Sequence, residues 1–163
     1  MLARLLTALA LLGLVACQKE SASPPVAGCR DPASVNYNAQ ATTDNGSCRY
    51  PADLVAGLYQ FRDTMVFTAW TGGGPQTQYL QGSFVVTKTG ATTVNIANFD
   101  ECATSQPASV SQTSFVVTAS SSCRSLSSFL GAVQGQGARL RYSYSFADGG
   151  GSGTVRGTAT KMP

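Results

Sequence analysis

The chain contains no histidine, and only 12% of its 163 residues are charged. The absence of histidine excludes a Ser-His-Asp triad, a Cys-His pair and a His-ligated zinc site. It also leaves no histidine base to activate a serine nucleophile. The 11 basic and eight acidic residues are too few and too balanced for a nucleic-acid-binding surface. We therefore expect no nucleic-acid partner and no catalytic residue.

Long apolar runs are also scarce, and the main one occupies residues 5–16, between Arg4 and Cys17. A bilayer-spanning helix needs roughly 20 apolar residues, so this run is too short and is typical of a signal peptide over residues 1–16. Its end, Leu14-Val15-Ala16-Cys17, resembles the lipobox of bacterial lipoproteins. The resemblance implies cleavage before Cys17 and diacylation of that cysteine. An ordinary secretory signal, with Cys17 in a disulfide, is the alternative.

The five cysteines are an odd number for an exported protein. Lipidation of Cys17 would leave four, which can pair in three ways. We expect Cys29 to pair with Cys48 and Cys102 with Cys123, because each pair brackets a loop of about twenty residues rich in turn formers. Each closure would contribute about 3 kcal/mol in the chain-entropy model.

Residues 17–28 combine the lipidated cysteine with a polar, proline-containing stretch that cannot form a core and is typical of a flexible tether. Gln18 follows Cys17, whereas in the resembled lipoproteins an aspartate there is the usual signal for retention in the inner membrane. The resemblance therefore implies the outer membrane, and leaves open whether the protein faces the periplasm or the cell surface.

Residues 28–50 resemble a short repeat of exported Bacteroidetes proteins, with the pattern Gly-Cys-x-Asp, then Asn-Tyr, then Asp-x-Gly-Ser-Cys-x-Tyr. The departures are Ser34 and Val35, where the repeat tends to have alanine and leucine. The resemblance implies a disulfide-closed module over residues 29–50, next to a larger domain.

This loop is crowded with side-chain oxygens of the kind that bind calcium, from Asp31, Asn36, Asn38, Asp44 and Asn45. Only two of these residues are carboxylates, their spacing does not match an EF-hand, and Arg30 and Arg49 lie beside the loop. We therefore favour Asx turns, in which each oxygen binds the loop's own backbone, with calcium as the alternative and no other cofactor.

Residues 53–163 alternate polar with Val, Thr, Tyr and Phe residues at a period of two, which predicts an all-β domain of antiparallel strands. The architecture is a small β-barrel or a β-sandwich. Leu54-Val55-Ala56-Gly57-Leu58-Tyr59, the segment 94–99 and a terminal Gly-Thr-Ala-Thr-Lys resemble the lipocalin-like domains of small Bacteroidetes lipoproteins. We expect strands near residues 58–61, 64–70, 79–88, 92–99, 114–119, 139–146 and 153–161.

Two hairpin registers follow from matching side chains across strands. In the first hairpin, Phe84 is expected opposite Ile96 and Val86 opposite Val94, around a turn at residues 89–91. In the last hairpin, large residues are expected opposite small ones, and the arginines are expected to point away from the core. Its expected pairs are Tyr144 with Val155, Tyr142 with Gly157 and Leu140 with Ala159.

Three groups of residues are candidates for binding, and one acidic pair is a candidate for glycoside chemistry. Arg139, Arg141 and Arg156 share one predicted face and could bind phosphate or an acidic glycan, although we favour a merely solvated face. Trp70, beside a glycine-rich loop, could stack on a sugar or plug the barrel. Tyr142 and Tyr144 would bind a ligand if the barrel held a pocket. Asp100 and Glu101, the only adjacent acidic pair, might suggest glycoside hydrolysis, but neighbouring strand residues point to opposite faces and cannot converge without a turn.

The sequence thus predicts a monomeric, lipid-anchored protein of the outer membrane that acts as a non-catalytic binding module for a small apolar ligand or a glycan. The alternatives are a structural spacer and, less favoured, an enzyme acting on glycans. A barrel with an internal pocket would favour binding, whereas a barrel filled by Phe84, Val86, Leu140 and Tyr142 would favour the structural role.

We expect Cys17→Ser to release the protein from membranes or to leave it unprocessed. The physical reason is that two or three acyl chains anchor stably, each buried CH₂ contributing ~0.8 kcal/mol, and the serine variant carries none. Membrane fractionation with an alkaline carbonate wash measures this. A variant that stays bound through the wash contradicts the lipid anchor.

Overall fold

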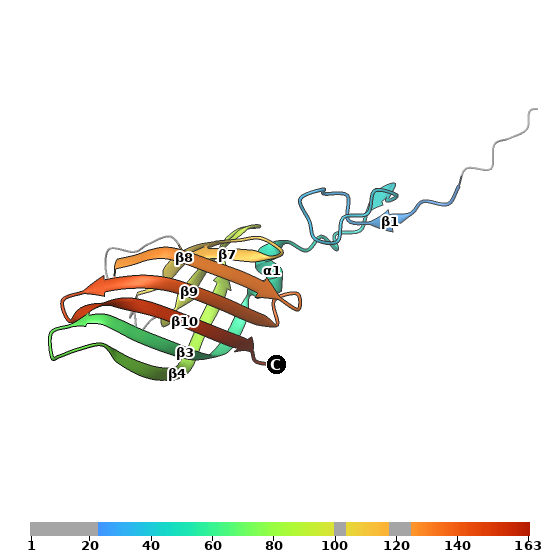
Figure 1. Cartoon of the computed structure of the whole chain (residues 1–163). Helices are drawn as coiled ribbons and strands as arrows, with labels where there is room; N and C mark the ends of the chain where they lie inside the picture. The colour runs from blue at the N-terminus through green and yellow to red at the C-terminus, as the bar shows by residue number, and fades with distance from the viewer. Residues whose placement is uncertain (1–22, 100–103, 118–124) are drawn as a thin grey trace, which may run out of the picture.

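The computed structural model describes residues 23–99, 104–117 and 125–163, which form a small disulfide-closed module followed by a closed antiparallel barrel (Figure 1). Each barrel strand pairs with the next along the chain, and the last pairs with the first, which is the up-and-down arrangement. The predicted all-β class is confirmed, as a barrel and not a sandwich. Its strands are β3 (Gly57–Trp70), β4 (Gln76–Lys88), β5 (Thr93–Ala97), β6 (Gln106–Val110), β7 (Ser114–Val117), β8 (Ser125–Gln134), β9 (Arg139–Asp148) and β10 (Gly151–Lys161).

The predicted register of the last hairpin, β9 with β10, is confirmed. Tyr144 lies opposite Val155, Tyr142 opposite Gly157 and Leu140 opposite Ala159. These residues point inward and are buried, whereas the alternate residues of both strands point outward. The complementarity of large and small side chains therefore fixes this pairing.

The predicted register of the first hairpin, β4 with β5, is wrong by two residues. Val86 lies opposite Ile96 and Lys88 opposite Val94. The turn is longer than expected, because the N–H groups of Thr89 and Gly90 both donate to the carbonyl of Thr93. Because side chains alternate with a period of two, a shift of two residues keeps each one on its predicted face.

Several elements differ from the sequence expectation. The predicted strands at 58–61 and 64–70 are one continuous strand, β3, and β6 and β8 were not predicted. A short helix, α1 (Pro51–Val55), precedes β3 and buries Ala52, Leu54 and Val55 against the barrel core. Among the described residues no helix has the length and apolarity needed to cross a membrane.

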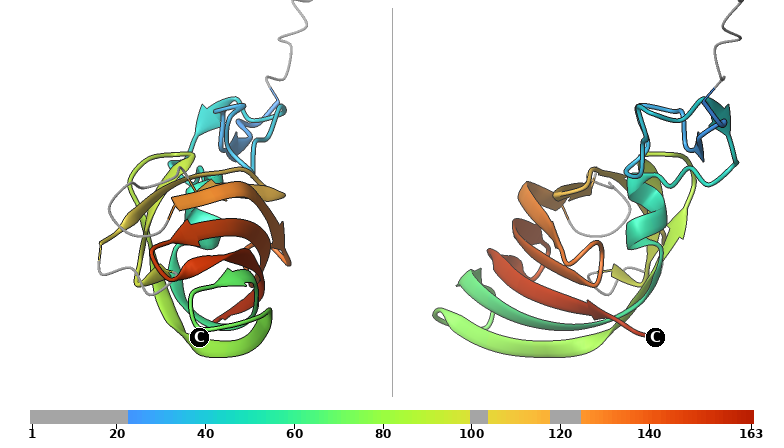
Figure 2. Two further views of the ribbon diagram at one scale, coloured as in Figure 1. Left: turned by 60° about the vertical axis from the view of Figure 1, so that its left-hand side comes forward. Right: turned by 90° about the vertical axis from the view of Figure 1, so that its right-hand side faces the viewer.

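The interior of the barrel is filled by its own side chains, many of them aromatic. Phe99 packs against Phe84 and Tyr142 with ring centroids 5.6 and 5.4 Å apart, and Phe129 stacks on Tyr144 at 5.8 Å. At the end covered by α1 (Figure 2), the apolar side chains leave a void of only about 10 Å³. Its lining residues are Val55, Val86, Val94, Ile96, Val110, Phe115 and Leu140.

Tyr59 is fully buried at this end, and its hydroxyl donates to the carbonyl of Gly137 at 2.6 Å. Burial raises the pKa of Tyr59 to about 12. Because the unfolded chain releases this proton near pH 10, the stabilisation is complete below pH 10 and is lost as the pH rises towards 12. The loss is roughly 3 kcal/mol.

We expect Tyr59→Phe to lower the free energy of unfolding by about 1 kcal/mol at pH 8, through the lost hydrogen bond. The same variant should lose less stability than the natural chain between pH 10 and 12. Denaturant unfolding at a series of pH values measures both effects. Tyr79→Phe, at an exposed tyrosine, is the matched control, and equal alkaline losses in all three proteins would contradict the role of Tyr59.

Candidate functional site

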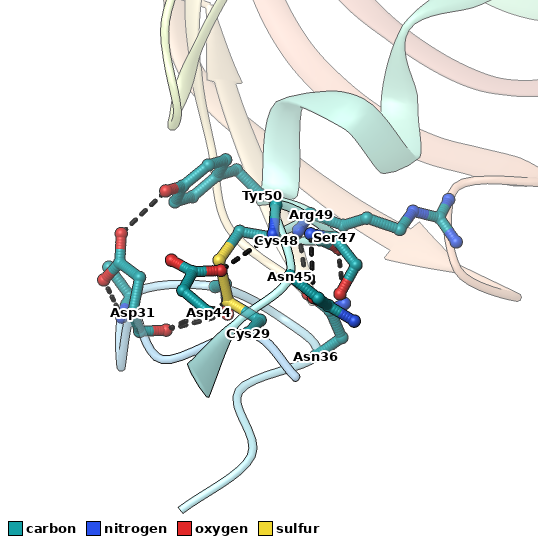
Figure 3. The surroundings of a disulfide bond; sticks show 12 residues. Cys29, Asp31, Asn36, Asp44, Asn45, Ser47, Cys48, Arg49 and Tyr50 are labelled. Atoms are coloured by element: carbon teal, nitrogen blue, oxygen red, sulfur yellow. Dashed lines mark hydrogen bonds between the residues drawn. A yellow bond between two sulfur atoms is a disulfide. The ribbon is translucent and has the colours of Figure 1, made fainter. Parts of the chain in front are cut away.

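The module that precedes the barrel is closed by the predicted disulfide between Cys29 and Cys48, whose Cα atoms lie 4.9 Å apart (Figure 3). Its short strands β1 (Ala27–Gly28) and β2 (Thr43–Asp44) pair in parallel, so the folded module begins within the stretch expected to be tether. Cys17, Cys102 and Cys123 lie outside the described residues, as do Asp100 and Glu101.

The side-chain oxygens considered for calcium are bound to the module's own backbone. In four Asx turns the side chain accepts from the N–H two residues further on, at 2.9 to 3.1 Å. Asn36 bridges the loop by donating to the carbonyl of Ser47 and accepting from the N–H of Arg49. Within the described ranges no three histidine, cysteine or acidic side chains cluster as a metal site would require. The four turn residues are Asp31, Asn38, Asp44 and Asn45.

Tyr50 and Asp53 connect the module to the barrel. The Tyr50 hydroxyl donates to Asp31 at 2.7 Å, and its backbone N–H donates to Asp53 at 2.8 Å. Lys88, at the end of β4, pairs with Asp53 at 2.6 Å and lies 5.5 Å from the centre of the Tyr50 ring. The hydrogen bond from Lys88, with that from the Tyr50 N–H, lowers the pKa of Asp53. This joint is polar and partly exposed.

The aromatic candidates of the sequence analysis belong to the core. Tyr142 and Tyr144 are buried inside the barrel, and Trp70 is half-buried at the end of β3, edge-on to Phe67 at 4.6 Å. Tyr142 donates its hydroxyl to Asp63, a buried carboxylate that the sequence analysis missed, at 2.7 Å. Asp63 points inward in the same alternation as Tyr59, Phe61, Met65 and Phe67. The sequence analysis did not detect this alternation at Asp63, because that residue lies in the gap between the predicted strands at 58–61 and 64–70.

The arginines lie on the outer surface of the barrel, on β3, β10 and β9, which run side by side between β4 and β8 in Figure 1. Arg62 of β3 joins the predicted arginines there, and it was missed for the same reason as Asp63. In one row across the strands, Thr158 of β10 lies between Arg62 and Arg141. In the next row, Arg156 of β10 lies between Thr64 and Ser143. We call Arg62, Arg141 and Arg156, with the small residues between them, the arginine face.

The arginine face carries a shallow, open groove of about 540 Å³. Strands lie about 4.8 Å apart, which places the Cα atoms of Arg62 and Arg141 roughly 10 Å apart, with Arg156 diagonal to both. None of the three arginines forms an ion pair with a carboxylate of the described chain. The groove is lined by Arg62, Thr64, Leu130, Gly131, Ala132, Arg141, Tyr142, Ser143, Arg156, Gly157 and Thr158.

Guanidinium groups present fixed donors that bind carboxylates and phosphates in a bidentate manner. Small hydroxyl side chains between them, such as Thr158 and Ser143, leave space for a ligand and can hydrogen-bond to it. Arg139 extends the positive charge along β9, opposite Thr160. The arrangement is therefore able to bind an anion without any catalytic group.

Neither the scan against protein-family models nor the search of curated proteins finds a match for this chain. The candidate site therefore rests on its geometry and charge.

We expect calcium to leave the stability of the module unchanged, because its oxygens are already bound by the backbone. Replacing the disulfide through Cys29→Ala with Cys48→Ala should lower the stability of the module by about 3 kcal/mol. Hydrogen exchange at the Val35 and Asn38 amides, which are bonded within the module, measures both changes. A calcium-dependent gain of about 2.7 kcal/mol at a hundredfold excess over Kd, absent in Asp44→Ala, would make the module a metal site.

Proposed function

We propose that this protein is a lipid-anchored component of the outer membrane, attached through Cys17, and that it is a non-catalytic binding module for an anionic ligand. The ligand is held on the arginine face, outside the barrel. The observation that carries the proposal is the groove between Arg62, Arg141 and Arg156, whose guanidinium groups form no ion pair with a described carboxylate.

Side chains fill the interior of the barrel, which supports a ligand site on its outer surface. The tyrosines expected to contact an internal ligand are packed among other rings, and Tyr142 is bound to Asp63. The void beneath α1, about 10 Å³, has room for about one water molecule at most. A small apolar ligand therefore finds no space among these residues.

The same filled interior favours a second candidate function, a structural spacer that holds another envelope component away from the membrane. The two functions differ in what the arginines do. A spacer tolerates their replacement with neutral side chains, whereas an anion-binding module does not.

Dextran sulfate and neutral dextran of equal length test the proposal on the full chain in neutral detergent. We expect the chain to bind dextran sulfate and not dextran, and the affinity to fall with added salt as the charges are screened. Arg62→Gln with Arg156→Gln should weaken binding by about tenfold, through lost charge-assisted hydrogen bonds.

The matched control is Arg30→Gln with Arg49→Gln, which removes the same charge from exposed positions of the module. This control variant should leave the affinity for dextran sulfate within about twofold of that of the natural chain, because neither residue contacts the ligand in the proposed site. Equal losses in the two double variants would reduce the effect to net charge and contradict the site. Full retention of binding without Arg62 and Arg156 would contradict the site, whereas a natural chain that does not bind dextran sulfate would leave the spacer as the function.

A further inference from the structure

Tyr79 is the most exposed of the large apolar side chains that the structure describes, with 81% of its surface open to solvent. It lies within β4 and not in a loop, so its position is set by the strand pairing. An aromatic ring displayed from the middle of a strand gives up burial that would have stabilised the fold. Such a ring is suited to contact something outside the molecule.

The strand pairing places Tyr79 beside the arginine face. It lies directly opposite Thr64, which in turn lies opposite Arg156. Together with Arg62 and Gln81, it lines a further hollow of about 460 Å³, which shares Arg62 and Thr64 with the arginine groove. The ring and the guanidinium groups therefore border one continuous surface.

This surface combines positive charge, an aromatic ring and neutral hydrogen-bonding groups. Arg62 and Arg156 supply paired donors for a carboxylate, and the face of the Tyr79 ring can stack on the C–H face of a pyranose ring. Between them, Thr64, Gln81 and Thr158 present neutral groups that both donate and accept hydrogen bonds. Charge, ring and hydroxyls occur together in an acidic sugar, whereas a polyphosphate has no ring.

We propose that the ligand of the arginine face is an acidic glycan. A sugar ring stacks on Tyr79, and the carboxylates of the glycan bind Arg62 and Arg156. This inference rests on the proposed function, since it names the class of anion that the same site takes. The binding involves no covalent step and no metal ion.

Three probes separate the parts of the inference on the full chain in neutral detergent. Tetragalacturonate carries both ring and charge, its methyl ester carries the ring alone, and tetrapolyphosphate carries the charge alone. We expect the affinity for tetragalacturonate to exceed that for the other two by about tenfold. Tyr79→Ala should reduce it by about tenfold and leave tetrapolyphosphate binding unchanged, whereas Tyr79→Trp should restore it.

Tyr37→Ala, at another exposed tyrosine, is the matched control and should change no affinity. If Tyr79→Ala has no effect on tetragalacturonate while Arg62→Gln with Arg156→Gln still weakens dextran sulfate, the acidic glycan is wrong and the anion site stands. If the arginine variants weaken no probe, the proposed function fails as well. Arginine-dependent binding to vesicles of anionic phospholipid, without binding to tetragalacturonate, would also overturn the glycan and assign the face to a membrane surface.

Discussion

The pairing of β9 with β10 in a single register is the constraint on which the rest of this structure depends. It turns Tyr142 and Tyr144 into the barrel and Arg141 and Arg156 out of it. A slip of one residue would exchange the two sets and bury the guanidinium groups, at a cost of several kcal/mol for each unpaired charge. The core and the arginine face are thus two consequences of one pairing.

The small residues of β10 make room for the large side chains that fill the interior of the barrel. Gly157 lies between Asp63 on one neighbouring strand and Tyr142 on the other, and a Cβ atom there would collide with both side chains. Its absence lets the Tyr142 hydroxyl reach Asp63, and the tyrosine ring then fills the space that a ligand would need. The Tyr142 hydroxyl and the Asp63 carboxylate are thus hydrogen-bonded to each other inside the barrel. The site that we propose lies on the outer surface.

The sequence predicts this fold best where both the size and the polarity of side chains alternate, as in the last hairpin. Alternation alone does not distinguish registers that differ by two residues. The register of β4 with β5 therefore depended on the length of the turn between them, and the glycine in that turn, Gly90, did not indicate its length. Pro107 in β6 and the serines of β8 obscured those strands. Arg62 was missed because two adjacent charged residues, Arg62 and Asp63, resembled a break between strands. The hydrogen-bond partner of Asp63, Tyr142, is 79 residues away in the chain, so the neighbouring sequence does not reveal it.

The electrostatics of the arginine face explain how the fold tolerates three like charges and what an anion gains there. Two unit charges at the roughly 7–10 Å Cα spacing of these arginines repel by only about 0.4–0.6 kcal/mol in water, so the strands can hold the arginines together at little cost. An anion placed between them is attracted by all three at once, and the β scaffold has already fixed the backbone from which each side chain projects. Flexible loops would have to lose conformational entropy on binding to create the same convergence. A barrel filled with aromatic rings is therefore well suited to the proposed role, because its rigidity positions the charges on its surface.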